Sequence, residues 1–267
     1  MRETQMDAQV GERMPPLTDE VGRDWRRLAG PTGPVGLFDP AAAETLPEPA
    51  RRWVVHAIEP GTPLLTTARL SMRGEIRLGR WLPFEAEQVL RPPCGFVWAA
   101  TAHLGTLPVT GFDSFVDGSG RTRWRLLDLL PLSSGAGPRT SRGAAGRLAA
   151  EFVLSPACAF ASWVRWIPVN ERRVIAFVTV HGIRHRVSLT VGHDGALSKL
   201  TVMRWGAPGG RRRGRQLFYV NVTEEATFDG FTIPSAVEAG WLAGGERPFI
   251  RYTIDQASYR WPLRPHR

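Results

Sequence analysis

Apolar and polar residues alternate along most of the chain, beginning in residues 64–78. The even positions of that segment are mostly apolar, whereas the odd positions include Arg69, Arg73, Glu75 and Arg77. A period of two is typical of a β-strand with one buried face. Gly74 interrupts the apolar row, as glycine does where a sheet bends. The segment therefore predicts one long strand with a bend near Gly74.

Similar runs, separated by turn residues, continue almost to the end of the chain. They predict strands at residues 81–91, 95–104, 107–117, 121–127, 164–169, 173–180, 183–191, 197–205, 216–224, 226–233, 236–243 and 249–254. The separators are glycine, proline and Asp-Gly pairs, which favour hairpins and hence antiparallel neighbours. A sheet of about a dozen strands must twist strongly or curl. We expect a mainly β fold, a half-barrel or open barrel that wraps one to three short helices.

Two segments have helical periodicity instead. Residues 47–58 carry prolines in the first turn and an apolar face, and residues 141–154 begin on a serine and are stopped by Pro156. Residues 1–45 are rich in proline and glycine and predict a flexible or loosely docked leader, with a short helix near residues 19–29. Residues 46–267 are expected to form a single curved-sheet domain.

Composition and charge exclude several classes of protein. Of the 267 residues 43% are hydrophobic and 22% charged, which excludes a largely disordered chain. The net charge is +9, but the arginines that produce it are scattered on the polar sides of strands, so no specific nucleic-acid partner is expected. The basic cluster at residues 211–215 predicts a solvated loop; contact with phosphate or an anionic membrane is the alternative. No secretory signal or transmembrane segment is apparent, and we expect a cytoplasmic protein.

A set of longer motifs resembles a known family. These motifs are LPEPARRWVVHAIEPGTPL, RGEIRLGRWLPFEAEQVLRPPCGFVW, DSFVDGSGRTRWRLLDLLPL, AAGRLAAEFVLSP, TFDGFTIPSAVEAGW and FIRYTIDQASYR. From about Leu46 to Arg260 the chain resembles a bacterial family of unknown function. The resemblance implies a fold similar to the lipoprotein carriers and lipid-binding lipoproteins of the bacterial envelope, with a curved sheet around an apolar cavity. The chain departs from those carriers because it shows no export signal and no lipidated cysteine near its start.

Familiar catalytic and metal motifs are not supported. DGSGR at residues 117–121 lies in a predicted hairpin turn and lacks the spacing of a serine-hydrolase elbow. His181 and His185 are expected to flank a hairpin in strand-like surroundings, where four residues span roughly 13 Å, too far to share a metal. No glycine-rich loop precedes a helix in the order that nucleotides require, so no cofactor is expected. The two cysteines, Cys94 and Cys158, predict free buried thiols.

Two acidic residues are candidates for catalysis. Asp113 has the strand parity of Val109 and Phe115, which would carry its carboxylate into the interior, and Glu151 lies one helical turn from Arg147. A buried carboxylate must be paired, hydrogen-bonded or protonated. Glu151 and Arg147 could also form an exposed surface pair. If both carboxylates face a cavity, they could orient a polar head group or act as acid and base.

Aromatic residues and arginines complete the predicted site. The chain has 10 tryptophans, and large aromatics on a curved sheet can form the walls of an apolar ligand cavity. The candidate ligand-binding residues are Trp98, Trp124, Phe115, Arg125, Arg204 and Arg251. We expect a protein that binds a bulky lipophilic small molecule. The alternative is a cofactor-independent cyclase or isomerase acting on a hydrophobic, polyketide-like substrate in the same cavity.

Overall fold

A single antiparallel sheet dominates the structure, a computed structural model that describes residues 17–30, 36–206, 214–243 and 245–259. Within these residues the sheet has 13 strands. They are β1 (Ala68–Leu78), β2 (Arg80–Arg91), β3 (Gly95–Leu104), β4 (Leu107–Val116), β5 (Ser119–Leu126), β6 (Leu130–Gly135), β7 (Val164–Asn170), β8 (Arg173–Val180), β9 (Ile183–Val191), β10 (Leu197–Gly206), β11 (Gly214–Phe228), β12 (Phe231–Trp241) and β13 (Arg247–Ser258).

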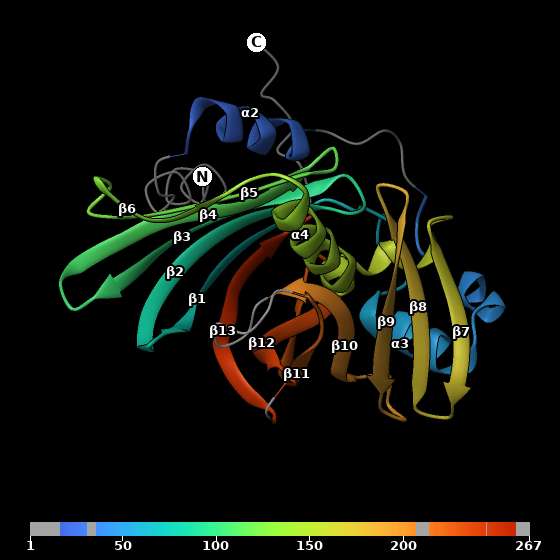
Figure 1. Cartoon of the computed structure of the whole chain (residues 1–267). Coiled ribbons are helices and arrows are strands. Elements are labelled where there is room, and N and C mark those ends of the chain that lie inside the picture. Colours follow the sequence, from blue (N-terminus) through green and yellow to red (C-terminus); the bar gives the residue numbers. More distant parts are fainter. Residues whose placement is uncertain (1–16, 31–35, 207–213, 244, 260–267) are drawn as a thin grey trace, which may run out of the picture.

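The strand order shows two meanders joined at their ends. The order β6-β5-β4-β3-β2-β1-β13-β12-β11-β10-β9-β8-β7 places the first and last strands side by side in the middle of the sheet. β1 pairs with β13 from Arg69↔Ser258 to Ile76↔Ile250, with a bulge between Ser71 and Met72. The edge strands β6 and β7 do not pair with each other, so the sheet stays open and curves around its helices (Figure 1). The predicted curved antiparallel sheet is confirmed.

Turn chemistry determines where the hairpins fall. Asp229 and Gly230 both have positive φ, 50° and 85°, and they form the turn between β11 and β12. This backbone twist suits a tight hairpin, and aspartate followed by glycine adopts it readily. The predicted separate strand at residues 226–233 is therefore wrong, because the chain reverses in its middle. Pro234, expected to lie between strands, is inside β12 beside a register irregularity, where its missing N–H is tolerated.

The edge strand β6 was missed by the sequence pattern. Its residues are almost all exposed, so they show no alternation between buried and solvated positions. Pro131 lies where the pairing with β5 shifts register, between Trp124 and Arg125. Short, irregular, proline-containing edges of this kind are common in natural sheets, since they discourage pairing with another chain.

Helices cover both faces of the sheet. They are α2 (Asp19–Leu28), α3 (Glu48–Ala57), α4 (Pro138–Glu151) and the short 3-10 helices η1 (Pro40–Thr45), η2 (Phe152–Leu154) and η3 (Pro156–Phe160). α4 connects the edge strands β6 and β7 and lies along the concave side of the sheet (Figure 1). It begins at Pro138, three residues earlier than predicted, and Ser141 bonds the carbonyl of Gly137 at 3.0 Å.

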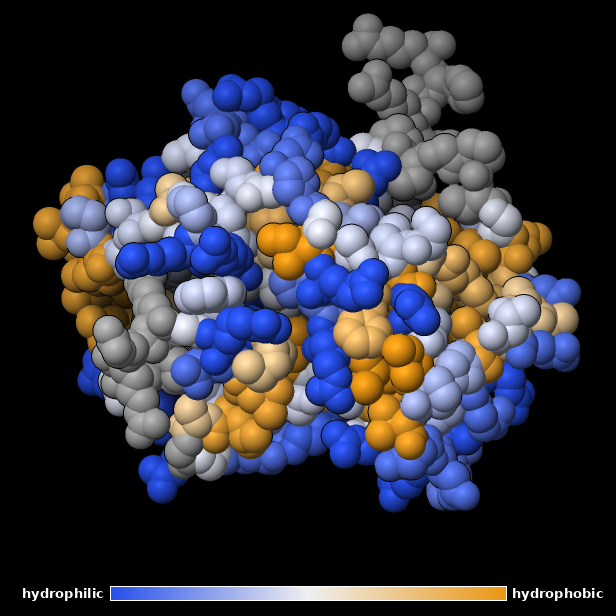
Figure 2. All heavy atoms as spheres, turned by 45° about the vertical axis from the view of Figure 1, so that its right-hand side comes forward, coloured by the Kyte–Doolittle hydropathy of each residue, from blue (hydrophilic) through white to orange (hydrophobic). Residues whose placement is uncertain are grey.

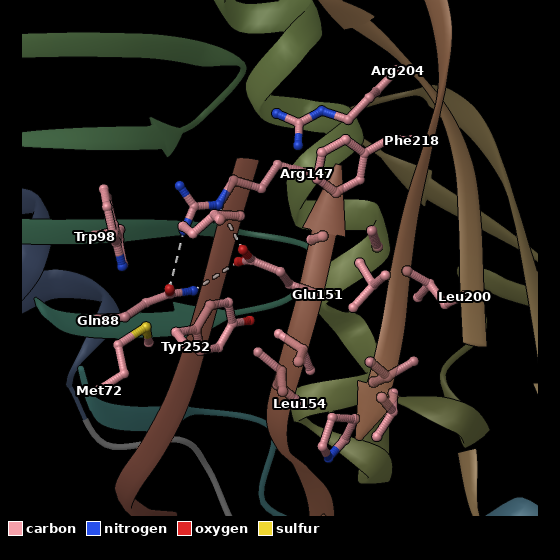
Figure 3. Close-up of a pocket in the computed structure, with 18 of the residues that line it drawn as sticks. Met72, Gln88, Trp98, Arg147, Glu151, Leu154, Leu200, Arg204, Phe218 and Tyr252 are labelled. Atoms are coloured by element: carbon pink, nitrogen blue, oxygen red, sulfur yellow. Dashed lines mark hydrogen bonds and ion pairs between the residues drawn. The ribbon is translucent and has the colours of Figure 1, made fainter. Parts of the chain in front are cut away.

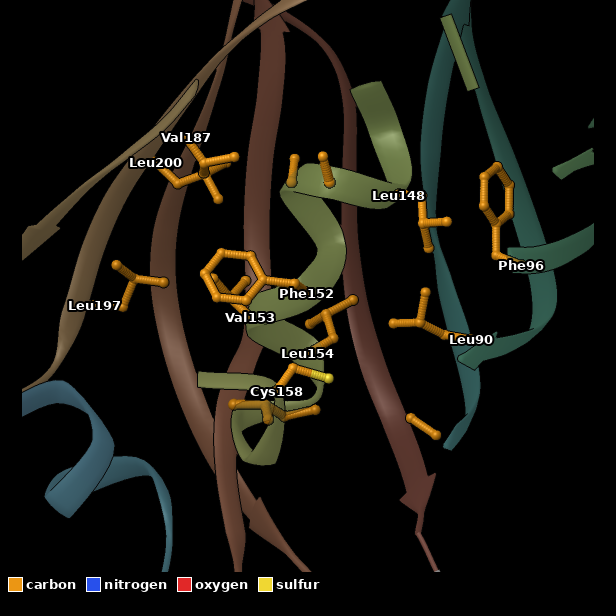
Figure 4. Packing of buried hydrophobic residues seen from close by; sticks show 14 of the residues in the cluster. Leu90, Phe96, Leu148, Phe152, Val153, Leu154, Cys158, Val187, Leu197 and Leu200 are labelled. Carbon is orange, nitrogen blue, oxygen red and sulfur yellow. The ribbon is translucent and has the colours of Figure 1, made fainter. Parts of the chain in front are cut away.

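Two hydrophobic cores hold these layers together. The main core fills the concave side; in Figure 4, Phe152 and Leu154 lie between Leu197 and Leu200 of β10 and Leu90 of β2. A smaller core lies on the opposite face, where the apolar side of α2 packs against strands β2, β3 and β4. The predicted helix near residues 19–29 is confirmed as α2. The division at residue 45 into a leader and one domain stays a prediction.

The surface is mostly hydrophilic, with separate apolar patches between the charged side chains in the view of Figure 2. Among the exposed apolar residues, Leu129 and Leu130 adjoin one another at the turn from β5 to β6, with 77% and 60% of their surface accessible. None of the helices in the described ranges is long and apolar enough to cross a membrane.

Candidate functional site: an apolar pocket with a polar end

Glycines allow α4 to lie unusually close to β10. A Cβ added to Gly146 would approach the Cβ of Arg204 to 2.7 Å, and one added to Gly143 would lie 3.1 Å from the carbonyl oxygen of Trp205. These glycines are one helical turn apart and face the same strand. Their lack of side chains thus brings Arg147, the residue after Gly146, onto the concave surface beside β10.

Arg147 joins two carboxylates that are distant in sequence. Its Nε donates to Oε1 of Glu151 at 2.6 Å, and its Nη1 lies 3.4 Å from Oδ2 of Asp113 on β4. Gln88 of β2 donates to Oε2 of Glu151 at 2.7 Å and accepts from Nη2 of Arg147 at 3.3 Å (Figure 3). Thr122 donates to the other oxygen of Asp113 at 2.5 Å. Each carboxylate is therefore bonded on both oxygens.

The electrostatics of this cluster favour a charged Arg147. Burial opposes the charge of Arg147, but Glu151 and Asp113 outweigh that effect, and the net result is a raised pKa of the Arg147 guanidinium. The guanidinium also lies 4.6 Å from the ring centre of Phe96 and 5.1 Å from that of Trp98. Flanking rings of this kind stabilise a desolvated cation. We call Arg147, Glu151, Asp113, Gln88 and Thr122 the polar cluster.

An apolar pocket extends from the polar cluster along the inside of the sheet. Its volume is about 170 Å³. Its walls come from α4, η2 and strands of both meanders, and its apolar lining residues include Met72, Val153, Leu154, Leu200, Phe218, Val237, Ala239 and Ile250. Tyr252 also lines it, and burial raises the pKa of its hydroxyl well above the usual value. The pocket thus has mostly apolar walls and polar groups at one end.

A second, more polar pocket adjoins the first. It has a volume of about 290 Å³ and is lined by Arg139, Thr140, Arg121 and Trp205 among others. Asp113, Arg147 and Arg204 line both pockets. These three side chains therefore form the boundary between an apolar and a polar compartment.

Arg204 differs from Arg147 in having no carboxylate bonded to it within the described residues. Its Nε is buried without a hydrogen-bond partner there, and its guanidinium lies 4.8 Å from the ring centre of Phe218 and 5.4 Å from that of Trp241. Burial, and then the neighbouring charge of Arg147, lower the pKa of Arg204 to about 10. Arg204 still carries its charge at neutral pH.

Four of the predicted site residues line the apolar pocket: Asp113, Glu151, Trp98 and Arg204. The parity argument for Asp113 correctly placed it on the inner face. The pair formed by Glu151 and Arg147 exists, but both side chains are largely buried, with 16% and 18% of their surface accessible, rather than exposed. Their roles in catalysis or ligand binding stay predictions.

The other four predicted residues lie outside this pocket. Phe115 is fully buried in the main core, and the ring of Trp124 lies tilted against that of Trp98, with ring centres 5.7 Å apart. Arg125 donates to the carbonyl of Asp128 at 3.2 Å. Arg251 donates to Glu75 at 2.7 Å and stacks over Trp81, away from the inner face. The sequence also offered Arg125, Arg204 and Arg251 as partners for the two acidic residues, but none of them forms an ion pair with Asp113 or Glu151 in the described structure. Arg147 takes that role because it lies on α4, between the carboxylates.

Sequence reasoning missed Gln88 and Tyr252. Gln88 is the one polar residue in the buried row Leu82, Phe84, Ala86, Gln88 and Leu90, which is a detectable signal. A lone amide on an apolar face needs a partner, and Glu151 supplies it. Tyr252 has the parity of Ile250 and of the buried Ile254 on β13, a signal that could have placed it on the inner face.

Other candidate chemistry does not converge on a site. His181 lies in the turn before β9 and His185 on β9, as expected for residues around a hairpin. Across the described part of the chain, no group of three or more metal-binding side chains is found. Both cysteines are free, but Cys94 is exposed rather than buried, whereas burial raises the pKa of Cys158 to about 12. Residues 211–213 of the predicted basic loop lie outside the described residues.

Residues 36–252 match the family described as "Family of unknown function (DUF6544)". The expectation of a family of unknown function is confirmed. No curated protein matches the chain.

Similar solved structures come from three bacteria. A putative outer membrane lipoprotein-sorting protein domain from Vibrio parahaemolyticus is 8% identical, with a TM-score of 0.45 over 83% of this chain and 94% of that one. A LolA superfamily protein from Nitrosomonas europaea is 7% identical, with a TM-score of 0.41 over 79% and 92%. A DUF1329 family protein from Desulfovibrio piger is 12% identical, with a TM-score of 0.33 over 85% and 95%.

Proposed function

The chain belongs to this family of unknown function, and we propose that it binds a lipophilic small molecule in the apolar pocket on the concave side of its sheet. The observation that carries the proposal is the pocket itself, a space of about 170 Å³ with mostly apolar walls that ends at a buried polar cluster. Small-molecule sites commonly combine an apolar lining with a few convergent polar groups that set the orientation of the ligand.

The volume limits what the apolar compartment can hold. An engineered cavity of about 150 Å³ in another protein stays dry and accepts benzene. The apolar compartment here, of about 170 Å³, therefore suits a ring or a short alkyl segment. A bulkier ligand would extend past Arg147 and Arg204 into the adjoining polar compartment of about 290 Å³.

The wall of the apolar pocket is already formed in the folded protein, which supports a role in ligand binding. Leu154 and Val153 enter the pocket wall from η2, which follows α4 directly, so the wall is part of the packed core. A preformed apolar wall limits the conformational entropy that ligand binding would cost. Apolar surface buried on binding contributes roughly 25 cal/mol per Å².

Calorimetric titration with neutral alkan-1-ols of increasing chain length tests the proposal. We expect binding of one molecule per chain, a negative heat-capacity change and affinity that rises with length until the pocket is full. Ala239→Phe, which fills the pocket from β12, should weaken binding, whereas Ser198→Phe at an exposed position of β10 should not. Absence of binding by every alcohol, or equal binding by the two variants, would contradict the proposal.

A further inference from the structure

Arg204 is a half-buried cation whose buried Nε has no described hydrogen-bond partner. Its guanidinium lies against the aromatic rings of Phe218 and Trp241. An arginine side chain offers five N–H donors in a planar fork that suits a carboxylate or a phosphate. Taking a charged group out of water is costly unless it gains a partner. No described carboxylate forms an ion pair with Arg204, so its guanidinium is open to an anionic partner.

The protein's own carboxylates are already engaged elsewhere. Glu151 accepts from Arg147 and Gln88, and Asp113 accepts from Thr122 and contacts Arg147. Neither carboxylate makes an ion pair with Arg204 in the described structure. The contacts of both acids go to Arg147, Gln88 and Thr122. The polar cluster as it stands therefore gives Arg204 no ion-pair partner.

The position of Arg204 fits the head group of an amphiphile. Its side chain lines both the apolar pocket and the polar pocket, together with Arg147 and Asp113. Figure 3 shows its guanidinium on the same side of the pocket as that of Arg147, above the apolar residues. The charge of Arg147 is close enough to depress the pKa of Arg204. An anion beside both groups would relieve that repulsion.

The polar pocket adds a further cation. Arg139, near the start of α4, lines this pocket and is exposed, and no described acidic residue forms an ion pair with it. Arg121, the other arginine there, is already bound to Glu20 and Asp24 of α2. Arg139 is thus a second arginine of the polar pocket that is open to an anion.

We propose that the ligand of the apolar pocket is an anionic amphiphile, whose carboxylate or phosphate head group binds the guanidinium of Arg204 while its alkyl part fills the apolar compartment. The inference rests on the proposed function and adds the chemical class of the ligand. The head group accepts hydrogen bonds from Arg204, and the polar pocket gives it access to solvent. Charge-assisted bonds of this kind are about twice as strong as neutral ones.

Matched ten-carbon probes test this inference. Decanoate, decyl phosphate, decan-1-ol and decylammonium share one chain length and differ in the head group. Calorimetry at neutral pH should show that at least one of the two anions binds about tenfold or more tightly than decan-1-ol. The stronger of the two anions identifies the head group as a carboxylate or a phosphate.

Arg204→Met and Arg251→Met form a matched pair of variants. Both arginines lie on strands and stack over a tryptophan, but Arg251 is bound to Glu75 outside the pocket. Arg204→Met should still bind decan-1-ol and lose the preference for anions, whereas Arg251→Met should keep it. Arg204→Lys should retain part of the preference for anions, because lysine keeps the positive charge but lacks the planar guanidinium that can bond two oxygens of an anion at once.

Two results would overturn the inference while leaving the proposed function intact. One is binding of decan-1-ol in the pocket with no tighter binding of either anion. The other is an anion preference that survives in Arg204→Met. If none of the four probes binds, the proposed function fails, and the inference that rests on it fails too.

Discussion

Arg147 and Arg204 lie side by side at the boundary of two pockets, yet Arg147 is bonded to two carboxylates and Arg204 to none that the structure describes. Burial lowers the pKa of both guanidinium groups. At Arg147 the bonded carboxylates outweigh that effect and the pKa is raised, whereas at Arg204 burial and the charge of Arg147 dominate and the pKa is lowered. The contrast separates a side chain that joins two carboxylates of the fold from one that we propose binds a ligand.

Replacing Arg147 with methionine should destabilise the protein. The change leaves Glu151 and Asp113 in the interior without their cation, and breaking a largely buried pair from one side costs about 3 kcal/mol or more. Chemical denaturation at neutral pH would measure the free energy of unfolding. The half-exposed pair of Arg251 and Glu75 provides the control, and Arg251→Met should change stability by less than about 1 kcal/mol. Equal effects of the two variants would contradict the account of the polar cluster.

Arg204→Met should have the opposite effect on the unliganded protein. Methionine keeps much of the apolar packing against Phe218 and removes a half-buried charge that has no ion-pair partner among the described residues. Replacing buried ionic groups with apolar ones of similar size is often neutral or stabilising by about 1 to 4 kcal/mol. The same denaturation measurement should therefore show a free energy of unfolding equal to or above that of the wild type. A loss comparable to that of Arg147→Met would mean that Arg204 has an anionic partner within the protein.

A side chain at Gly146 should push α4 away from β10. A Cβ there would lie 2.7 Å from the Cβ of Arg204, so Gly146→Val should destabilise the protein by about 1 to 3 kcal/mol. Gly22 in α2 is the matched control, since the nearest atom to an added Cβ there is 3.8 Å away. Gly22→Ala should raise stability by roughly 0.5 kcal/mol, because alanine is the better helix former. Thermal unfolding compares the two, and a neutral Gly146→Val would disprove the close packing.

His185 should make the protein less stable in mild acid. Burial, and then the charge of Arg215, lower the pKa of His185 in the folded state. The unfolded chain, whose histidine pKa is about 6.5, then binds the proton more readily, so stability is retained above about pH 6.5 and lost as the pH falls toward the folded pKa. His185→Gln should flatten this part of the pH dependence of the free energy of unfolding. His193→Gln, at an exposed histidine, controls for the loss of one histidine; an unchanged slope in His185→Gln would reject the prediction.

The sequence predicted most of the sheet because burial repeats with a period of two. The sequence pattern missed β6, because that strand is exposed along its length and shows no alternation. It misplaced the boundary between β11 and β12, because that boundary depends on the turn at Asp229-Gly230 rather than on hydrophobicity. The pairing of β1 with β13 joins residues at opposite ends of the domain, and no local pattern indicates it.

The alternation of strand residues also predicted part of the candidate site. It placed the side chain of Asp113 on the inner face of the sheet, and it could have identified Gln88 as a polar residue in an apolar row. The role of Arg147 could not be found in this way, because it depends on how α4 crosses the sheet, which Gly143 and Gly146 permit. Arg251 was chosen for its charge, but it lies on the other face, bound to Glu75. A cyclase or isomerase activity and a cytoplasmic location stay predictions.

Native mass spectrometry of the freshly purified protein, followed by organic extraction, tests the central claim most directly. The account predicts a lipophilic molecule bound to each chain in the wild type, and its loss or depletion in the pocket-filling variant Ala239→Phe. Ser198→Phe should retain it. A wild-type protein that carries no such molecule and takes up none when neutral alkan-1-ols are added would contradict the claim that the apolar pocket is a ligand site.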